Sequence, residues 1–491
     1  MGKSVSELQS ENVREMRILS LDVKDWRLLK EPQIRFKTVC TVIIGENGSG
    51  KSTLLELILN IFDFVFKRLE RPRYHVTIDG YCLRYEIERN GVLHQVEIES
   101  GYYEDSKPEE LHIKIDERPF FVESSPNFIR DVLPSNILVY YAGDTDRLEQ
   151  LCGYYFEHNA RTLANKGGDY TLTPLKLPKR SPFIYSDIKH LDTVLLSLLV
   201  NNLESPTIDK LDIDKASVAA VIKLKKPGWA TKNESDELWG NKSKLIEEFI
   251  SGMISRSTQT VVEGDKKIII EIDVNVVRDF LQELEVQDKG MFLFDMFELL
   301  RTNELLEDIS LNWHKRGSGI DGDTISAYYF SEGEKQVVLT SALVEFWDEE
   351  QCLFLMDEPD TFLHPSWQNV FLPELQRHLK ESHVIITTHS VLMLSSIKDG
   401  CDLYMMKKGK MIDFNLNTYG MDANEIITLA METAPRSQYV DNLMRQIQED
   451  IKMRNLDSAK GKLEELKGYG VSEFNINRLR STIERLESIG R

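Results

Sequence analysis

A glycine-rich segment near the N-terminus has the residue types that hold a phosphate chain. Residues 45–52 read GENGSGKS and fit the pattern G-x-x-x-x-G-K-[ST]. Glycines let the backbone curl so that its N–H groups point at an anion. We expect Lys51 to reach the β- and γ-phosphates and Ser52 to ligate Mg²⁺. The predicted phosphate-binding residues are Gly45, Asn47, Gly48, Ser49, Gly50, Lys51, Ser52 and Thr53.

Two carboxylates end an apolar segment in the second half of the chain. Residues 352–356 read CLFLM and are followed by Asp357 and Glu358. At the end of a buried strand beside a phosphate loop, Asp357 can bind Mg²⁺ directly or through water. Glu358 follows it and can polarise an attacking water as a general base. On its own, the same pattern is typical of an ordinary acidic turn.

A histidine ends the next apolar segment, residues 384–388. His389 can contact a γ-phosphate there and respond to its loss, although a single histidine after a strand is usually structural. The catalytic residues that the sequence predicts are therefore Lys51, Glu358 and His389, with Ser52 and Asp357 as metal ligands.

The segments around these residues must bring them to one edge of a sheet. Residues 39–44 and 136–143 are continuous apolar runs, as buried parallel strands are. Residues 52–66 have the apolar spacing of a helix. Residues 331–347 and 366–380 predict helices that alternate with strands, which indicates an α/β fold.

The spacing of apolar residues divides the chain into four predicted parts. Alternation in residues 16–36 and 72–121 predicts paired strands and an antiparallel β subdomain. The predicted parts are an N-terminal lobe with the glycine-rich loop (1–150), a mainly helical insertion (151–320), a C-terminal lobe (321–436) and a tail of two or three amphipathic helices (437–491).

Bulk composition limits the class of protein. The chain has 491 residues, a net charge of −20 and 41% hydrophobic residues, which suits a globular protein and disfavours general nucleic-acid coating. Its five scattered cysteines contain no C-x-x-C pair, so we expect reduced thiols and no zinc site. No apolar run approaches 18 residues and the N-terminus lacks a signal-peptide core. We therefore expect a cytoplasmic protein without a membrane span.

One further segment, residues 330–336 (FSEGEKQ), opens a predicted helix with Ser331 as N-cap and Glu334 at the capping-box position. Together with GENGSGKS, LFLMDEP and TTHS, it resembles the ordered motifs of ABC-type ATPases of the RecF/Rad50/SMC-like group. The resemblance implies an ABC-type mixed sheet with flanking helices, ATP and Mg²⁺ as ligands, and a homodimer or higher oligomer. The signature residues Ser331, Gly333 and Glu334 of one subunit would contact ATP held by Lys51 of the other.

The chain departs from that pattern in two places. Glu332 stands where many transporter ATPases have glycine, and no Q-loop glutamine can be assigned within the expected zone, residues 140–144. Residues 360–365 (DTFLHP) resemble the DExxLHP form of OLD-like ATPases. Residues 419–426 and the tail resemble ATPases of bacterial anti-phage systems, namely the Septu ATPase PtuA and the retron-associated ATPases, which work beside a separately encoded HNH-type nuclease.

Two main functions follow from the resemblance. The first is a nucleotide-dependent sensor or regulator of an anti-phage defence complex with a separate effector nuclease. The alternative is a RecF/SMC-like DNA-repair or chromosome-maintenance ATPase that clamps DNA; a transporter subunit ranks third. Nucleic acid could meet the basic stretches 176–180, 223–226 and 407–410, which are more often solvated surface. The 102 residues after His389 are too few for a Toprim nuclease, and we expect no nuclease domain in this chain.

Overall fold

The computed structural model describes residues 16–489 with several gaps, and it forms two compact units, residues 1–419 and 420–491. The gaps in the description are residues 72–74, 76, 105, 108, 122–124, 144–146, 154–157, 159–169, 179, 202–204, 231–237, 265, 317–323, 349–350, 398–399, 414–417, 423–424, 427–437, 470 and 472.

A seven-stranded sheet runs through the first unit in the order β11-β10-β17-β18-β5-β19-β20. Neighbouring strands are parallel except for β20, which returns antiparallel beside β19. Every residue of β5, β17 and β18 is buried, which explains their continuous apolar sequences. The predicted parallel strands are confirmed. The bounds are β5 (Cys40–Ile44), β10 (Ile137–Tyr141), β11 (Phe183–Ser186), β17 (Leu353–Asp357), β18 (His383–Thr388), β19 (Asp402–Lys407) and β20 (Lys410–Asp413).

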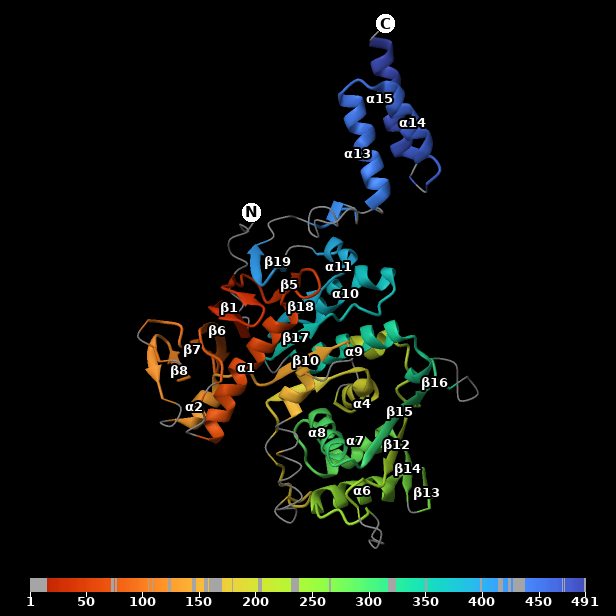
Figure 1. Cartoon of the computed structure of the whole chain (residues 1–491). Helices are drawn as coiled ribbons and strands as arrows, with labels where there is room; N and C mark the ends of the chain where they lie inside the picture. The colour runs from red at the N-terminus through yellow and green to blue at the C-terminus, as the bar shows by residue number, and fades with distance from the viewer. Residues whose placement is uncertain are drawn as a thin grey trace, which may run out of the picture. The chain divides into compact units, whose positions relative to one another are not determined.

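The predicted antiparallel subdomain is a six-stranded sheet in the order β4-β1-β6-β7-β8-β9. Helix α1 (Lys51–Glu70) lies between this sheet and the seven-stranded one, and its apolar side chains share a core with both (Figure 1). Contact on two sides explains why most of α1 is buried. The strands are β1 (Met16–Val23), β4 (Gln33–Arg35), β6 (Tyr81–Arg89), β7 (Val92–Ser100), β8 (His112–Ile115) and β9 (Arg118–Phe120).

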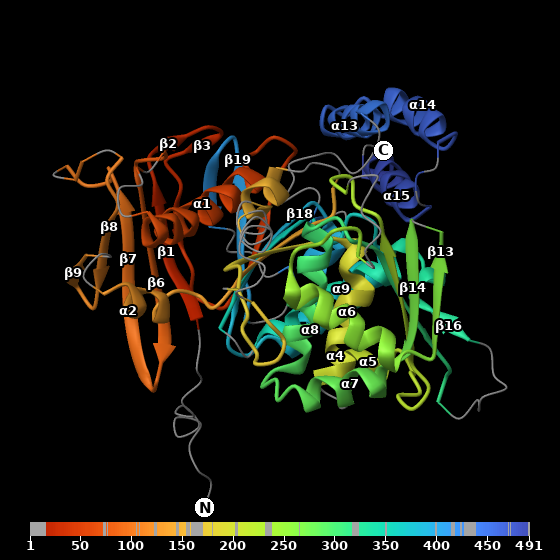
Figure 2. The same ribbon diagram turned by 90° about the horizontal axis from the view of Figure 1, so that it is seen from below.

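The insertion contains the predicted helices and also a five-stranded sheet, β13-β14-β12-β15-β16, that the sequence interpretation did not include. Strands β12 and β14 alternate buried and half-buried residues over only seven positions each. This short alternation lay between stronger helical patterns, so the sequence did not indicate the strands. Helices α4, α6, α7 and α8 contact this sheet (Figure 2). The bounds are α4 (Leu191–Asn201), α5 (Pro206–Lys210), β12 (Ala219–Lys225), α6 (Lys244–Arg256), β13 (Gln259–Glu263), β14 (Lys267–Asp273), α7 (Val274–Glu283), α8 (Lys289–Thr302), β15 (Leu306–Trp313) and β16 (Ile325–Ser326).

The remaining elements of the first unit connect and cover the sheets. Helices α9 and α10 pack against each other before and after β17. A small hairpin, β2 and β3, lies beside the glycine-rich loop, because Leu28 and Leu29 approach Gly50. The bounds are β2 (Asp25–Trp26), β3 (Leu29–Lys30), α2 (Pro126–Asp131), η3 (Ile188–His190), η4 (Ala327–Tyr329), α9 (Glu332–Trp347), α10 (Pro365–His378) and α11 (Val391–Ser395).

The second unit contains three amphipathic helices, α13 (Gln438–Lys452), α14 (Leu456–Leu466) and α15 (Glu473–Ile489). They pack around one apolar cluster made by Leu443, Ile447, Ala459, Leu463, Leu466, Ile476, Leu479 and Ile483. The sequence predicted two or three amphipathic helices in residues 437–491, and three are present.

No helix in the described parts of the chain is long and apolar enough to cross a membrane.

Candidate nucleotide-binding site

The glycine-rich loop joins the C-terminal end of β5 to the N-terminus of α1. Gly48 and Gly50 have positive φ angles of 75° and 110°, which glycine adopts without strain. A side chain at Gly45 would lie 2.3 Å from the carbonyl oxygen of Met406 in β19. The amide of Gly409 donates to the carbonyl of Ser49 at 2.9 Å. The β19–β20 hairpin therefore packs closely on the loop and helps to fix its curl.

Three side chains that the sequence predicted as catalytic meet beside this loop. The Nζ of Lys51 lies 3.0 Å from the carbonyl oxygen of Gly45 and 2.6 Å from Nε2 of His389. The same Nε2 lies 3.0 Å from Oε1 of Glu358. A ring nitrogen can donate a proton to Glu358 or accept one from Lys51, but not both at once. The three groups therefore form one linked proton and charge network.

The two acidic residues after β17 have different surroundings. Asp357 is buried and pairs in register with Thr387 of β18, whose hydroxyl donates to it. The Ser52 hydroxyl opposes the effect of burial, which raises the pKa of Asp357. Glu358 has a positive φ of 51°, and its amide donates to the Thr387 carbonyl at 3.0 Å. This conformation directs the chain out of the strand, so Glu358 reaches His389 while Asp357 stays beside Ser52.

Burial and close charges shift the pKa values of these groups. Burial raises the pKa of Asp357, and the hydrogen bond with His389 lowers the pKa of Glu358. Burial also lowers the pKa of Lys51, although Glu358, Asp357 and Asp360 oppose this effect. Glu358 is thus ionised at neutral pH and available as a base.

The residues fit a magnesium–nucleotide ligand. Ser52 and Asp357 offer the hydroxyl and carboxylate oxygens that Mg²⁺ prefers. Gly48 faces open space, since nothing lies within 4 Å of where its Cβ would be. The Ser49 hydroxyl is buried and has no hydrogen-bond partner among the described residues. Asn47 is exposed on the loop and Thr53 is buried in α1.

Asp360 and Thr388 are residues of this site that the sequence interpretation did not assign to it. The Thr388 hydroxyl donates to Asp360 at 2.8 Å, and burial raises the pKa of Asp360 to about 6. Both residues lie within two positions of a residue that the sequence predicted as catalytic. The two threonines directly before His389 were the sequence feature that could have indicated Thr388 as part of the site. They tie the turn after β17 to the end of β18.

The signature segment forms the predicted capped helix start. Ser331 is the N-cap of α9; its hydroxyl accepts from the Glu334 amide at 3.3 Å, and its own amide donates to the Glu334 carboxylate at 2.8 Å. Ser331 and Glu334 are exposed, whereas Gly333 is buried against the backbone of residues 362–364. A side chain at Gly333 would lie 3.1 Å from the Phe362 carbonyl oxygen, so glycine permits this close approach.

The signature segment and the glycine-rich loop lie at different places along the sheet edge. Glu332 lines a cavity with Tyr140 and Tyr141 at the end of β10, whereas the loop follows β5. Strands β17 and β18 separate β10 from β5, which amounts to about 14 Å at the usual strand spacing. One chain therefore brings Lys51, Ser52, Asp357, Glu358 and His389 together, and holds Ser331, Gly333 and Glu334 apart from them.

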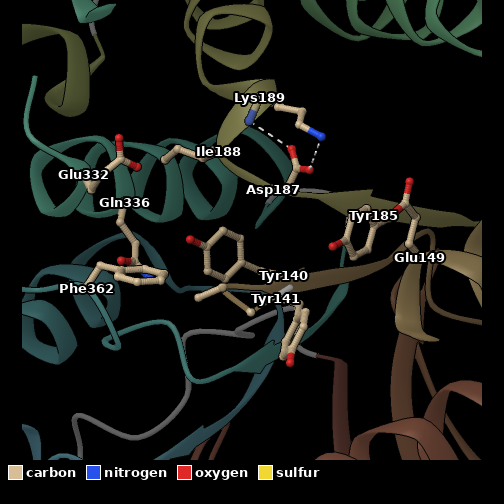
Figure 3. Close-up of a pocket in the computed structure, with 12 residues that line it drawn as sticks. Tyr140, Tyr141, Glu149, Tyr185, Asp187, Ile188, Lys189, Glu332, Gln336 and Phe362 are labelled. Atoms are coloured by element: carbon tan, nitrogen blue, oxygen red, sulfur yellow. Dashed lines mark hydrogen bonds and ion pairs between the residues drawn. The ribbon is translucent and has the colours of Figure 1, made fainter. Parts of the chain in front are cut away.

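The cavity beside the signature segment has a volume of about 410 Å³. Figure 3 shows three tyrosines, Tyr140, Tyr141 and Tyr185, together with Gln336 of α9 around it. Residues 140–143, most of the zone expected for a Q-loop, line this cavity, and Asp144 lies outside the described residues. The buried glutamine beside the expected Q-loop zone is Gln336, which belongs to the signature helix α9 and not to the loop after β10.

Two protein families match separate parts of this chain. The family described as "AAA ATPase domain" matches residues 16–150, and the family described as "AAA domain, putative AbiEii toxin, Type IV TA system" matches residues 242–395. The first range contains the glycine-rich loop, and the second contains the signature segment, Asp357, Glu358 and His389. The matches thus cover both halves of the site.

Similar proteins include the "Retron Ec83 probable ATPase" of Escherichia coli, which is 31% identical over 84 residues. That alignment covers 17% of this chain and 15% of the relative. Among solved structures, the SMC head domain from Thermotoga maritima gives a TM-score of 0.35 at 12% identity, covering 82% of this chain and all of that one. The recombination mediator protein RecF gives 0.32 at 14% identity, covering 82% and 99%.

The likeness to ATPases rests on the two matched domains and agrees with the geometry around Lys51. The phosphate loop, the signature segment, the acidic strand end and the histidine follow one another along the chain, and the acidic strand end and the histidine meet beside the phosphate loop. Residues 16–150 and 242–395 of this chain match families of ATPase domains, and the chain resembles an ATPase associated with a retron.

Proposed function

We propose that this protein binds ATP with Mg²⁺ at Lys51 and Ser52 and hydrolyses it with Glu358 as the general base. One observation carries the proposal: His389 Nε2 lies 2.6 Å from Lys51 Nζ and 3.0 Å from Glu358 Oε1. A phosphate-binding ammonium, a histidine and an ionised carboxylate are thereby placed at the mouth of one glycine-rich loop. That combination suits activation of a water beside a terminal phosphate.

Each group has a separate task in this scheme. The backbone amides of residues 45–52 and the Lys51 ammonium hold the phosphates. Ser52 and Asp357 hold Mg²⁺, which neutralises charge that develops on the phosphate oxygens. Glu358 takes a proton from the attacking water. His389, linked to both Lys51 and Glu358, orients Glu358 and registers the presence of the terminal phosphate.

We also propose that two chains complete the site as an ATP sandwich. The start of α9 is separated from the glycine-rich loop of its own chain by two intervening strands. Large apolar side chains around that start are exposed: Tyr328 at 76%, Tyr329 at 77% and Phe362 at 58%. Exposed aromatic groups beside a polar helix N-terminus suit a protein interface, and Ser331 would meet the partner's phosphate there.

In the cell, we propose that this ATPase is the nucleotide-dependent sensor of an anti-phage defence complex, with a separate HNH-type nuclease as effector. The similarity to a retron ATPase supports this role, as does the resemblance of residues 419–426 and the tail to ATPases of anti-phage systems. Among the described residues, no group of three or more histidines, cysteines and acidic residues could hold a metal ion. We place the nuclease on another chain, as in the anti-phage systems whose ATPases residues 419–426 and the tail resemble.

A DNA clamp is the alternative function, and the basic stretches give it little support. Lys223 forms an ion pair with Asp308 at 3.0 Å, and Arg180 lies 3.4 Å from Asp295. Cations that already have acidic partners contribute less to binding a phosphate backbone.

The substitution Glu358→Gln tests the chemistry. We expect ATP binding to persist, the rate of hydrolysis to fall by about 10²–10⁴-fold, and an ATP-dependent dimer to accumulate in light scattering. Glu307→Gln is the matched control, because Glu307 is equally exposed and pairs with Lys267 at 2.7 Å in the insertion. Normal turnover of Glu358→Gln would remove Glu358 as the base.

The cellular role needs a different experiment. The tagged Glu358→Gln protein, purified from its own host with ATP, should retain an HNH-type nuclease that mass spectrometry identifies. Retention of DNA-repair proteins instead, with ATP-dependent binding of duplex DNA, would favour the clamp. DNA cleavage by the purified chain alone would contradict the proposal of a separate effector.

A further inference from the structure

Two cysteines meet on neighbouring strands of the seven-stranded sheet. Cys40 is the first residue of β5, and Cys401 directly precedes β19. The parallel register pairs the next residues, Thr41 and Asp402, so the two cysteines lie side by side. Their Sγ atoms are 2.6 Å apart. A disulfide bond is about 2.05 Å long, so a small adjustment of the two side chains would suffice to form one.

The backbone already has a spacing that a disulfide tolerates. Neighbouring strands lie about 4.8 Å apart, and bridged cysteines usually have Cα atoms about 4.4–6.8 Å apart. The amides of Lys37 and Thr38 both donate to Asp402, at 2.6 and 2.8 Å, which fixes the start of β5 against the start of β19. The strands would not have to move for the two sulfur atoms to bond.

The two thiols differ in access to solvent. Cys40 is buried, whereas Cys401 is partly exposed and its sulfur accepts a hydrogen bond from Gln376 at 3.1 Å. The hydrogen bond with Cys401, together with burial, raises the pKa of the Cys40 thiol well above its ordinary value. Cys401 is therefore the sulfur that meets an oxidant first, and Cys40 is placed to resolve the product.

We propose that Cys40 and Cys401 are a modification site, which a peroxide converts into an intramolecular disulfide. The Cys401 thiol loses its proton, the thiolate attacks one peroxide oxygen and the O–O bond breaks. Cys401 becomes a sulfenic acid, and the hydroxide that leaves takes up the proton to form the first water. The Cys40 sulfur then attacks the Cys401 sulfur, the S–O bond breaks, and a second water carries away the Cys40 proton. The two thiols lose two electrons in total, which reduce one peroxide to two waters.

The bond would join the two strands that hold the glycine-rich loop. Strand β5 leads into the loop, and the β19–β20 hairpin contacts it through the Met406 carbonyl and the Gly409 amide. The cysteines lie at the opposite end of these strands, so the bond would brace the loop without touching bound nucleotide. This inference does not depend on the proposed function.

Peptide mapping of the full chain tests the site. After reduction and then treatment with hydrogen peroxide, trypsin should release residues 38–51 linked to residues 399–407, each of which contains one cysteine. Denatured oxidised protein should label two fewer thiols than the five of the reduced protein. Cys401→Ser should abolish the linked peptide, and Cys82→Ser, which removes a cysteine elsewhere, should retain it.

Thermal unfolding provides a second measurement. Oxidised wild-type protein should unfold at a higher temperature than reduced protein, because the bond closes a very long loop, and Cys401→Ser should show no such difference. Full labelling of all five thiols after peroxide would overturn the proposal. So would a linkage that joins two different chains, or a sulfinic Cys401 beside a free Cys40.

Discussion

Two histidine–carboxylate networks in this protein use the same groups in opposite surroundings. At the nucleotide site, the side chains of His389 and Glu358 are 32% and 33% exposed and lie 3.0 Å apart. In the insertion, His190 of η3 lies 3.5 Å from Glu298 of α8 and 3.0 Å from Asp187, and the His190 and Glu298 side chains are only 7% and 9% exposed. Arg301 completes the second network at 3.2 Å from Glu298.

The difference lies in what each network can still bind. His190 has a carboxylate on each ring nitrogen, so it is saturated by its own chain. Burial alone would lower the pKa of His190, but Glu298 and Asp187 outweigh it and raise the pKa to about 9. His389 instead shares one nitrogen between a cation and an anion at an open surface. A saturated buried network stabilises a fold, whereas an unsaturated open one is available for chemistry.

The largest expected effect is on activity at the open network. Lys51→Ala should reduce ATP hydrolysis by at least about 10²-fold, since it removes the cation that holds the terminal phosphates. Isotopic phosphate release and nucleotide binding would measure the loss. Lys30→Ala, in the exposed hairpin beside the loop, is the control and should leave both unchanged. Undiminished turnover of Lys51→Ala would reject the assignment of the phosphate site.

A pair of identical substitutions tests the comparison directly. His190→Gln should lower the free energy of unfolding by about 3 kcal/mol, because it removes the buried cation that Asp187 and Glu298 share, and should spare the rate of hydrolysis per folded molecule. His389→Gln should do the reverse, with a slower rate and stability within about 0.5 kcal/mol of wild type. Chemical denaturation and steady-state ATPase assays would show both. Equal stability losses in the two variants would end the distinction.

The dependence of stability on pH should separate the same two networks. The folded protein holds the His190 proton up to about pH 9, whereas the unfolded chain releases it near pH 6.5. The stabilisation is therefore complete below about pH 6.5 and is lost as the pH rises through 9, with a total of about 3 kcal/mol. Denaturation curves at several pH values should show this slope in wild type. In His190→Gln, the free energy of unfolding should depend less on pH. If this variant shows the same pH dependence as wild type, His190 is not its source.

Much of the candidate site could be predicted from the sequence, because its residues lie at or just after the C-terminal ends of parallel strands. Asp357 ends β17, Glu358 and His389 directly follow β17 and β18, and Lys51 follows the loop after β5, so the strand order brings them together. The buried network could not be predicted in this way. His190 and Glu298 are over a hundred residues apart, and their contact depends on how α8 packs, which no local pattern records.

Long-range packing also explains why the sheet of the insertion and the position of Gln336 were not predicted from the sequence. The sheet of the insertion pairs β12 with β14 and β15, strands that are separated by helices, so its strands gave only short alternating signals. Gln336 was visible in the sequence as part of a capped helix, but its approach to Tyr140 arises from the packing of α9 across the end of β10. Interactions that cross between elements need the fold itself.

The smallest expected effect concerns Ser331, where a structural and a functional role overlap. Ser331→Ala removes the N-cap hydroxyl of α9 and should lower stability by about 1 kcal/mol. If Ser331 also contacts ATP held by a second chain, the variant should hydrolyse ATP more slowly and dimerise less with ATP. Ser243→Ala is the matched control, because Ser243 caps α6 through the same kind of bond and lies in the insertion. A similar stability loss in both variants with normal ATP-dependent dimerisation of Ser331→Ala would leave Ser331 a helix cap alone, and the sandwich would lose its main contact.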